Sequence, residues 1–183
     1  MRKPISLLHN MSVHQPPLEK LDDAGNNTSI TNQLLASITP IPYASATQHD
    51  FLCFVGSLSV STDALAYWLH QDRIYASQAY PRFIGALISK IPFSSASNSR
   101  DMNERIFKVL VFSLQNVMRE VNFFDEIAVK FDLPLEQWKE RRGTRDYTAE
   151  MARIAGPGGS LAEGMVFLWA MEKVSPAGAV CRN

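Results

Sequence analysis

The feature that most constrains this chain is one long stretch in which apolar residues recur at helical spacing. Asp101 and Glu104, three residues apart, have the spacing of a capping box, which predicts that a helix starts close by. From Asn103 to Phe131 the apolar residues form a single stripe: Ile106, Val109, Leu110, Val117, Val121, Phe124, Ile127, Ala128 and Phe131. Such a stripe buries one face of a helix against its neighbours, so the pattern predicts a long core helix.

The segment from Thr62 to Ile91 has the same period and is rich in apolar residues. Pro81 interrupts it, and proline cannot donate the backbone hydrogen bond that a helix interior needs. The segment therefore predicts two packed helices that meet near Pro81. A shorter amphipathic stretch begins at Ile30 and is predicted to end before Pro40, because proline disfavours helical geometry in the residue before it.

Two further helical segments start near Thr144 and Ser160, on either side of the turn sequence GPGG. Ser160 and Glu163 again have capping-box spacing. No stretch of strand length alternates β-branched and polar residues between hairpin turns. The sequence therefore predicts an all-α fold.

With 183 residues the chain is long enough for one globular domain. We expect that domain to span residues 30–175. Residues 11–29 lack apolar periodicity and are rich in polar residues, so we expect residues 1–29 to form a disordered tail. Residues 176–183 are expected to lie outside the domain.

Composition excludes several classes of function. Lys and Arg together number 18, as do Asp and Glu, so the chain lacks the positive field that favours nucleic acid. Its N-terminus has too short an apolar run for a signal peptide, and no segment approaches the about 20 apolar residues of a membrane span. Cys53 and Cys181 lie far apart, which argues against a zinc site and a disulfide scaffold. We expect a cytoplasmic protein without nucleic-acid or membrane partners.

Several short motifs occur in an order typical of one family. Between Ala46 and Pro92 the chain reads T-x-H-x-F-L, then G-x-L, then W-L-x-Q-D-x-x-Y. The sequences TRDYT at 144–148 and EGMVFLWAMEK at 163–173 follow. These motifs resemble the TenA/thiaminase II family over roughly residues 30–175. The resemblance implies a haem oxygenase-like helical bundle that needs no cofactor or metal and forms homo-oligomers, either dimers or tetramers.

The resemblance also implies a substrate site. Asp72 would be the aspartate that accepts hydrogen bonds from an aminopyrimidine, and Tyr75, one helical turn later, would lie on the same face. Tyr147 would be the aromatic residue that flanks the ring. The alternative is that Asp72 is a solvated helix residue and that the two tyrosines are core aromatics.

The catalytic group implied by the resemblance is a glutamate. Bacterial-type members have a nucleophilic cysteine in the later helix, but Met165 and Trp169 stand in the corresponding motif here, so that thiolate chemistry is absent. WAMEK at 169–173 resembles the eukaryotic branch, in which Glu172 would move protons. Alternatively, Glu172 and Lys173 form an exposed charge pair near a helix end.

The activity implied is hydrolysis of a thiamin-derived aminomethyl-aminopyrimidine to the hydroxymethyl pyrimidine, with release of ammonia. After Val174 the family continues with closing helices and another glutamate, whereas this chain reads SPAGAVCRN and resembles a truncated member. The alternative is therefore a non-catalytic or truncated pyrimidine-binding or oligomerising protein. Oxidative chemistry like that of pyrroloquinoline quinone synthesis proteins ranks last. His49 is expected to cap or pack, and neither it nor His70 is expected to bind metal.

Overall fold

The computed structural model describes residues 29–37, 47, 49–57, 59–92, 97–134 and 138–174. Every regular element in these ranges is a helix, which confirms the all-α class. No helix in the described ranges is long and apolar enough to cross a membrane. The two predicted tails lie outside the described residues, apart from Ser29 at the end of the first.

The chain divides into two compact units, Met1–Val60 with Met171–Asn183, and Ser61–Ala170. The first contains α2 (Ile30–Ala36) and α4 (Asp50–Gly56). The predicted domain boundaries of residues 30 and 175 stay a prediction.

Two short helices of the first unit are capped by local side chains. Ser29 Oγ accepts a hydrogen bond from the backbone of Asn32 at the start of α2. His49 Nδ1 accepts one from the backbone N–H of Phe51, 3.1 Å away, which confirms the expected capping role. Cys53, in α4, is disulfide-bonded, contrary to our expectation, because spacing along a sequence does not limit which residues a fold brings together.

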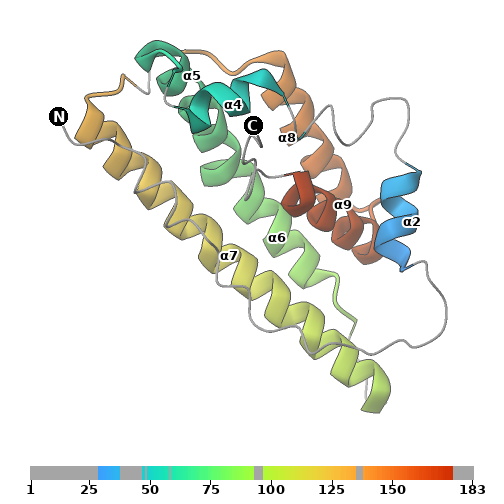
Figure 1. The fold of residues 1–183 in the computed structure, drawn as a ribbon. Helices are drawn as coiled ribbons and strands as arrows, with labels where there is room; N and C mark the ends of the chain where they lie inside the picture. The colour runs from blue at the N-terminus through green and yellow to red at the C-terminus, as the bar shows by residue number, and fades with distance from the viewer. Residues whose placement is uncertain are drawn as a thin grey trace. The chain divides into compact units, whose positions relative to one another are not determined.

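The second unit holds the larger core. It consists of α5 (Thr62–Ile74), the π-helical turn η2 (Tyr75–Ala79), α6 (Tyr80–Ser89), α7 (Ser97–Phe131), α8 (Arg142–Ala155) and α9 (Leu161–Val174) as far as Ala170. In Figure 1, α6 lies between α7 and α8, and it packs against both. The innermost side chains are Leu69, Phe83, Ile84, Leu87, Leu110, Met151, Ile154 and Leu168.

The break expected at Pro81 does not occur. The helix instead widens into the π turn η2 and continues directly into α6, with Pro81 in the first turn of α6. Proline has no N–H to donate and its ring collides with the carbonyl four residues earlier, so a widened turn relieves the conflict without ending the helix. The prediction of a break was therefore wrong.

Helix α7 begins earlier than predicted. It starts at Ser97, so Asp101 and Glu104 lie within the helix and form no capping box. Glu104 instead pairs with Lys108, one turn on, at 2.6 Å. Val109 is 42% exposed, whereas its neighbour Leu110 is fully buried, because successive helix residues point about 100° apart.

The connection between α8 and α9 follows the predicted turn. The backbone N–H of Glu163 donates to Ser160 Oγ over 3.1 Å, which confirms the expected cap of α9. Lys90, after α6, donates from Nζ to the carbonyls of Gly156 and Gly159 at 2.6 and 2.8 Å. A cation is stabilising there, because the carbonyls at a helix C-terminus carry partial negative charge.

Candidate functional site

An acid pair forms where α5 meets α7. Asp72 lies in the last turn of α5, and its carboxyl is largely enclosed by protein although part of the residue reaches solvent. Burial, and to a lesser extent the negative charge of Glu120 on α7, together raise the pKa of Asp72 to about 7. Two carboxyls close together in a poorly solvated position resist ionising together.

Tyrosines from two elements border this acid pair. Tyr75 is the first residue of η2, and its ring meets that of Tyr147 on α8 edge to face, with 5.5 Å between centroids. Burial raises the pKa of Tyr75 far above its usual value, and the nearby charges of Asp72 and Glu120 raise it further. The Tyr75 hydroxyl therefore keeps its proton and remains a hydrogen-bond donor.

The structure thus brings three predicted site residues, Asp72, Tyr75 and Tyr147, into one cluster. We expected Tyr75 to follow Asp72 by one turn of an ordinary α-helix, with both side chains on the same face. It instead opens the π turn, where the backbone N–H of Tyr80 donates to the carbonyl of Tyr75. This five-residue spacing also brings the buried Tyr80 within electrostatic reach of the Tyr75 hydroxyl.

Further aromatic rings extend from the cluster into the core. The ring of Phe167 on α9 lies 5.9 Å from that of Tyr147 and 5.6 Å from that of Phe83 on α6. Phe83 is almost fully buried. The aromatic series therefore ties the acid pair to the rigid centre of the unit.

The cation next to Asp72 in sequence is directed elsewhere. Arg73 Nε lies 3.0 Å from Asp125 Oδ1 on α7, as an ion pair without the alignment of a hydrogen bond. Glu120 receives a long hydrogen bond of 3.5 Å from the Asn116 amide. Arg73 therefore does not counteract the effect of burial and of Glu120 on the pKa of Asp72.

Sequence reasoning missed the residue that holds the site together. Gln71 is buried, and its side-chain oxygen accepts hydrogen bonds from the backbone of Arg141 at 2.9 Å and from the Thr144 hydroxyl at 2.8 Å. Its amide nitrogen donates to the carbonyl of Lys139 at 3.2 Å. Gln71 therefore anchors the start of α8, the helix that carries Tyr147. The only sequence signal was a glutamine beside Asp72 on an otherwise apolar helix face.

Glu172 is not part of the described cluster. It is an exposed residue in the last turn of α9 and falls in the first unit, so its predicted catalytic role stays a prediction. His70 lies on α5 with its ring 6.2 Å from that of Trp138. Within the described ranges, no three His, Cys, Asp or Glu side chains are grouped to hold a metal ion.

One curated protein resembles the chain: a "Probable transcription factor" of Fusarium pseudograminearum, strain CS3096. The two are 31% identical over 129 residues, which is 70% of this chain and 26% of the Fusarium protein. The chain thus spans about a quarter of the length of that relative. No protein-family model matches the chain, and no solved structure matches it.

These comparisons overturn the resemblance to the TenA/thiaminase II family. The similarity points to a probable transcription factor and away from thiamin metabolism. The predicted thiaminase-type hydrolase and its pyrimidine salvage role are wrong on this finding, and nothing in it supports the truncated pyrimidine-binding alternative. The motifs misled because W-L-x-Q-D-x-x-Y reflects helix packing as well as chemistry: Leu69 and Gln71 are both buried for structural reasons.

Proposed function

We propose that the Ser61–Ala170 unit is a regulatory module that binds a small organic cation. The observation that carries this proposal is the acid pair of Asp72 and Glu120 beside Tyr75 and Tyr147. A cation between the two carboxyls would let both ionise and would remove the repulsion that raises the pKa of Asp72. The acid pair costs folding stability without a ligand, as groups kept for binding often do.

The surroundings favour a cation with several N–H donors and an apolar body. Carboxylates pair most strongly with ammonium, amidinium or guanidinium groups, because the hydrogen bonds are charge-assisted. The faces of Tyr75 and Tyr147 attract cations through their ring quadrupoles. A π turn at Tyr75 supports the same interpretation, since such turns often occur at functional sites.

A regulatory role is supported by the name of the Fusarium relative, a probable transcription factor. The chain carries equal numbers of acidic and basic residues, which suits it poorly to binding phosphates. We therefore assign effector binding, rather than contact with DNA, to this unit.

A matched pair of probes tests the proposal. Benzamidine and neutral benzamide differ in charge but hardly in shape, and a ligand that binds the folded state raises its melting temperature. We expect benzamidine, and not benzamide, to stabilise the chain. Binding should strengthen as the pH rises through about 7, because the acid pair must lose its proton to hold the cation.

Two variants complete this test. Asp72→Asn should abolish stabilisation by benzamidine, whereas Asp63→Asn, the same change on the exposed first turn of α5, should leave it intact. Agmatine serves as an aliphatic cation of the same class. The proposal fails if neither cation stabilises the chain, or if Asp63→Asn and Asp72→Asn reduce the response equally.

Two finer expectations remain proposals. A haem oxygenase-like arrangement of the bundle is supported by the all-helical order of the elements, and an experimental structure tests it. Cytoplasmic placement is the second proposal. Fluorescence microscopy of a tagged chain tests it, and concentration in the nucleus would contradict it.

A further inference from the structure

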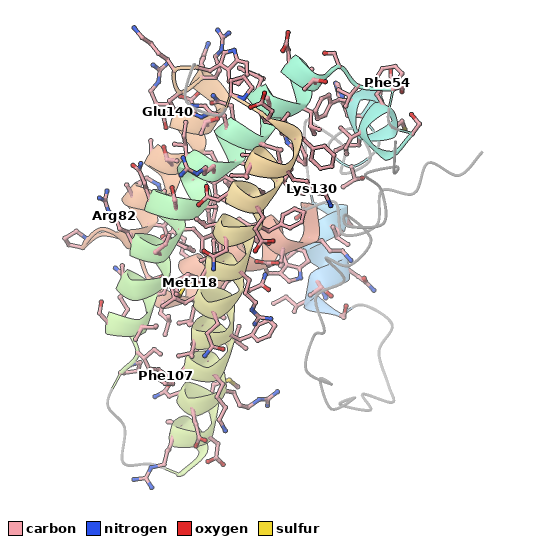
Figure 2. The ribbon with its side chains drawn as sticks, turned by 90° about the vertical axis from the view of Figure 1, so that its left-hand side faces the viewer. Phe54, Arg82, Phe107, Met118, Lys130 and Glu140 are labelled. Carbon is pink, nitrogen blue, oxygen red and sulfur yellow. The ribbon has the colours of Figure 1, made fainter. Side chains whose placement is uncertain are left out.

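The start of α8 presents a cluster of arginines around one threonine. Arg141 and Arg142 stand three and two residues before Thr144, and the three arginines of the cluster are exposed. The third, Arg145, follows the half-buried Thr144 directly. Figure 2 labels Glu140, the residue before this cluster, where the chain enters α8 beside α5. In the printed sequence, no other serine or threonine has an arginine at both of these preceding positions.

The cluster has positive charge that is not used within the fold. In the part of the chain that the structure describes, neither Arg141 nor Arg145 forms an ion pair with an acid. Arg142 lies 3.3 Å from Asp146 one turn later, but both side chains are exposed, and such pairs contribute little to stability. These arginines are therefore available to a negatively charged group.

The threonine hydroxyl takes part in the contact between α5 and α8. Thr144 Oγ1 donates to Gln71 Oε1 over 2.8 Å. The guanidinium of Arg141 lies over the ring of Tyr67, 5.4 Å from its centroid. Tyr67 and Gln71 are one helical turn apart on α5 and so are neighbours on its surface. Arg141 is thus held next to the hydrogen bond that Thr144 makes.

We propose that Thr144 is a phosphorylation site and that its phosphate releases the start of α8 from α5. A protein kinase whose peptide cleft is lined with acidic groups would recognise the two arginines before the hydroxyl. In the transfer, Thr144 Oγ1 bonds to the γ-phosphorus of ATP, the bond from that phosphorus to the bridging oxygen breaks, and ADP leaves. The hydroxyl proton goes to the catalytic aspartate of the kinase. The proposal does not depend on cation binding at Asp72.

The first turn of α8 is built to open locally. Arg141, at its N-cap position, makes no side-chain capping hydrogen bond. Gly143 lies in the first turn with open space around it, and glycine lowers the stability of a helix. The turn is held to α5 through Gln71, which binds the backbone N–H of Arg141 and the hydroxyl of Thr144. Opening of this short segment exposes the hydroxyl to a kinase.

A phosphate removes the donor that Gln71 uses. Phosphate oxygens at neutral pH accept hydrogen bonds, and the group carries about 1.5 to 2 negative charges. If the Gln71 amide turned to donate to the phosphate, the N–H of Arg141 and the carbonyl of Lys139 would lose their present partners. Either arrangement breaks part of the anchor, whereas Arg141 and Arg145 gain charge-assisted hydrogen bonds to the phosphate. The arginines, rather than α5, then hold the start of α8.

Phosphate transfer to the full chain tests the site. The chain is incubated with ATP and the catalytic subunit of the cyclic-AMP-dependent protein kinase, which selects arginines at these two positions, and mass spectrometry of its peptides locates the phosphate. We expect phosphate on Thr144. Thr148 is the internal comparison, because it has Arg145 three residues before it but Asp146 two residues before it. No transfer to Thr144, or transfer to Thr148 in preference, would overturn the proposal.

Matched variants separate the motif from general charge. Arg142→Gln should slow the transfer about tenfold or more, because a charge-assisted contact to the kinase is lost. Lys139→Gln makes the same change of charge at an exposed residue five positions before the threonine, and should leave the rate unchanged. Thr144→Ser should keep the phosphate and Thr144→Val should lose it. Equal slowing by Arg142→Gln and Lys139→Gln would contradict recognition of the motif.

Hydrogen–deuterium exchange measures the release of α8. After phosphorylation we expect the backbone amides of residues 139–148, including that of Arg141, to exchange about tenfold faster or more. The amides of α7 serve as the reference and should not change. Thr144→Val treated with the kinase in the same way should show no acceleration. A chain that carries phosphate on Thr144 with unchanged exchange at the start of α8 would overturn the proposed release.

Discussion

At the scale of single residues, Asp72 sets the pH dependence of stability. Its pKa is about 7 when folded and near 3.8 when unfolded, so between these values the folded state binds the proton more tightly. Stability from this group is therefore present at low pH and lost as the pH rises from about 4 to about 7. We expect Asp72→Asn to raise the free energy of unfolding at pH 8 by roughly 2 to 4 kcal/mol, and to change it little at pH 4.

Urea denaturation of both proteins between pH 4 and pH 8 measures this effect. Asp125→Asn is a suitable control, because Asp125 is half exposed and ion-paired. Loss of stability in Asp72→Asn at pH 8 would show that Asp72 serves the fold and would contradict the proposed binding role.

Gln71 is expected to contribute more to the free energy of unfolding than an exposed glutamine does. Gln71→Ala removes three hydrogen bonds to the start of α8 and leaves part-buried backbone groups without partners. We expect it to lower the free energy of unfolding by about 2 to 4 kcal/mol. Gln78→Ala, at an exposed position of η2, should change it by less than about 0.5 kcal/mol. Similar losses in both variants, measured by chemical denaturation, would count against the anchoring role.

At the scale of elements, the approach of α9 to α6 depends on one glycine. A Cβ on Gly164 would lie 2.2 Å from Leu87 Cδ2, and Leu87 is fully buried. Because the core cannot yield easily, Gly164→Ala should cost about 1 to 3 kcal/mol. Gly85→Ala, in α6 with open space around it, should instead stabilise by up to about 1 kcal/mol. Thermal unfolding of the two variants measures the difference, and a stabilising Gly164→Ala would contradict this packing.

Two helical segments show which sequence patterns predicted the structure correctly and which did not. The stripe on α7 predicted buried Leu110, Val117, Phe124 and Ile127 correctly, because helical period reports burial directly. Pro81 was misjudged, since a proline conflict can be relieved by a π turn as well as by a break. Local sequence does not distinguish these outcomes.

At the scale of the whole molecule, the equal numbers of acidic and basic residues predict that the chain binds nucleic acid only weakly. We expect a fluorescently labelled random-sequence duplex to show no binding tighter than about 100 µM at 0.15 M salt, because few phosphates could be neutralised. Fluorescence anisotropy measures this. Micromolar binding that weakens steeply with salt would contradict the assignment of effector binding to this chain.

The sequence by itself determined the helical class, most helix positions and the capping by Ser160 and His49, since these depend on residues close together in the chain. It placed Asp72, Tyr75 and Tyr147 among the site candidates, although the family that suggested them was wrong. Only the tertiary structure decided that burial and Glu120 raise the pKa of Asp72 and that Gln71 anchors α8. These effects join residues from different helices, and their strength depends on burial, which the packing of the whole unit creates.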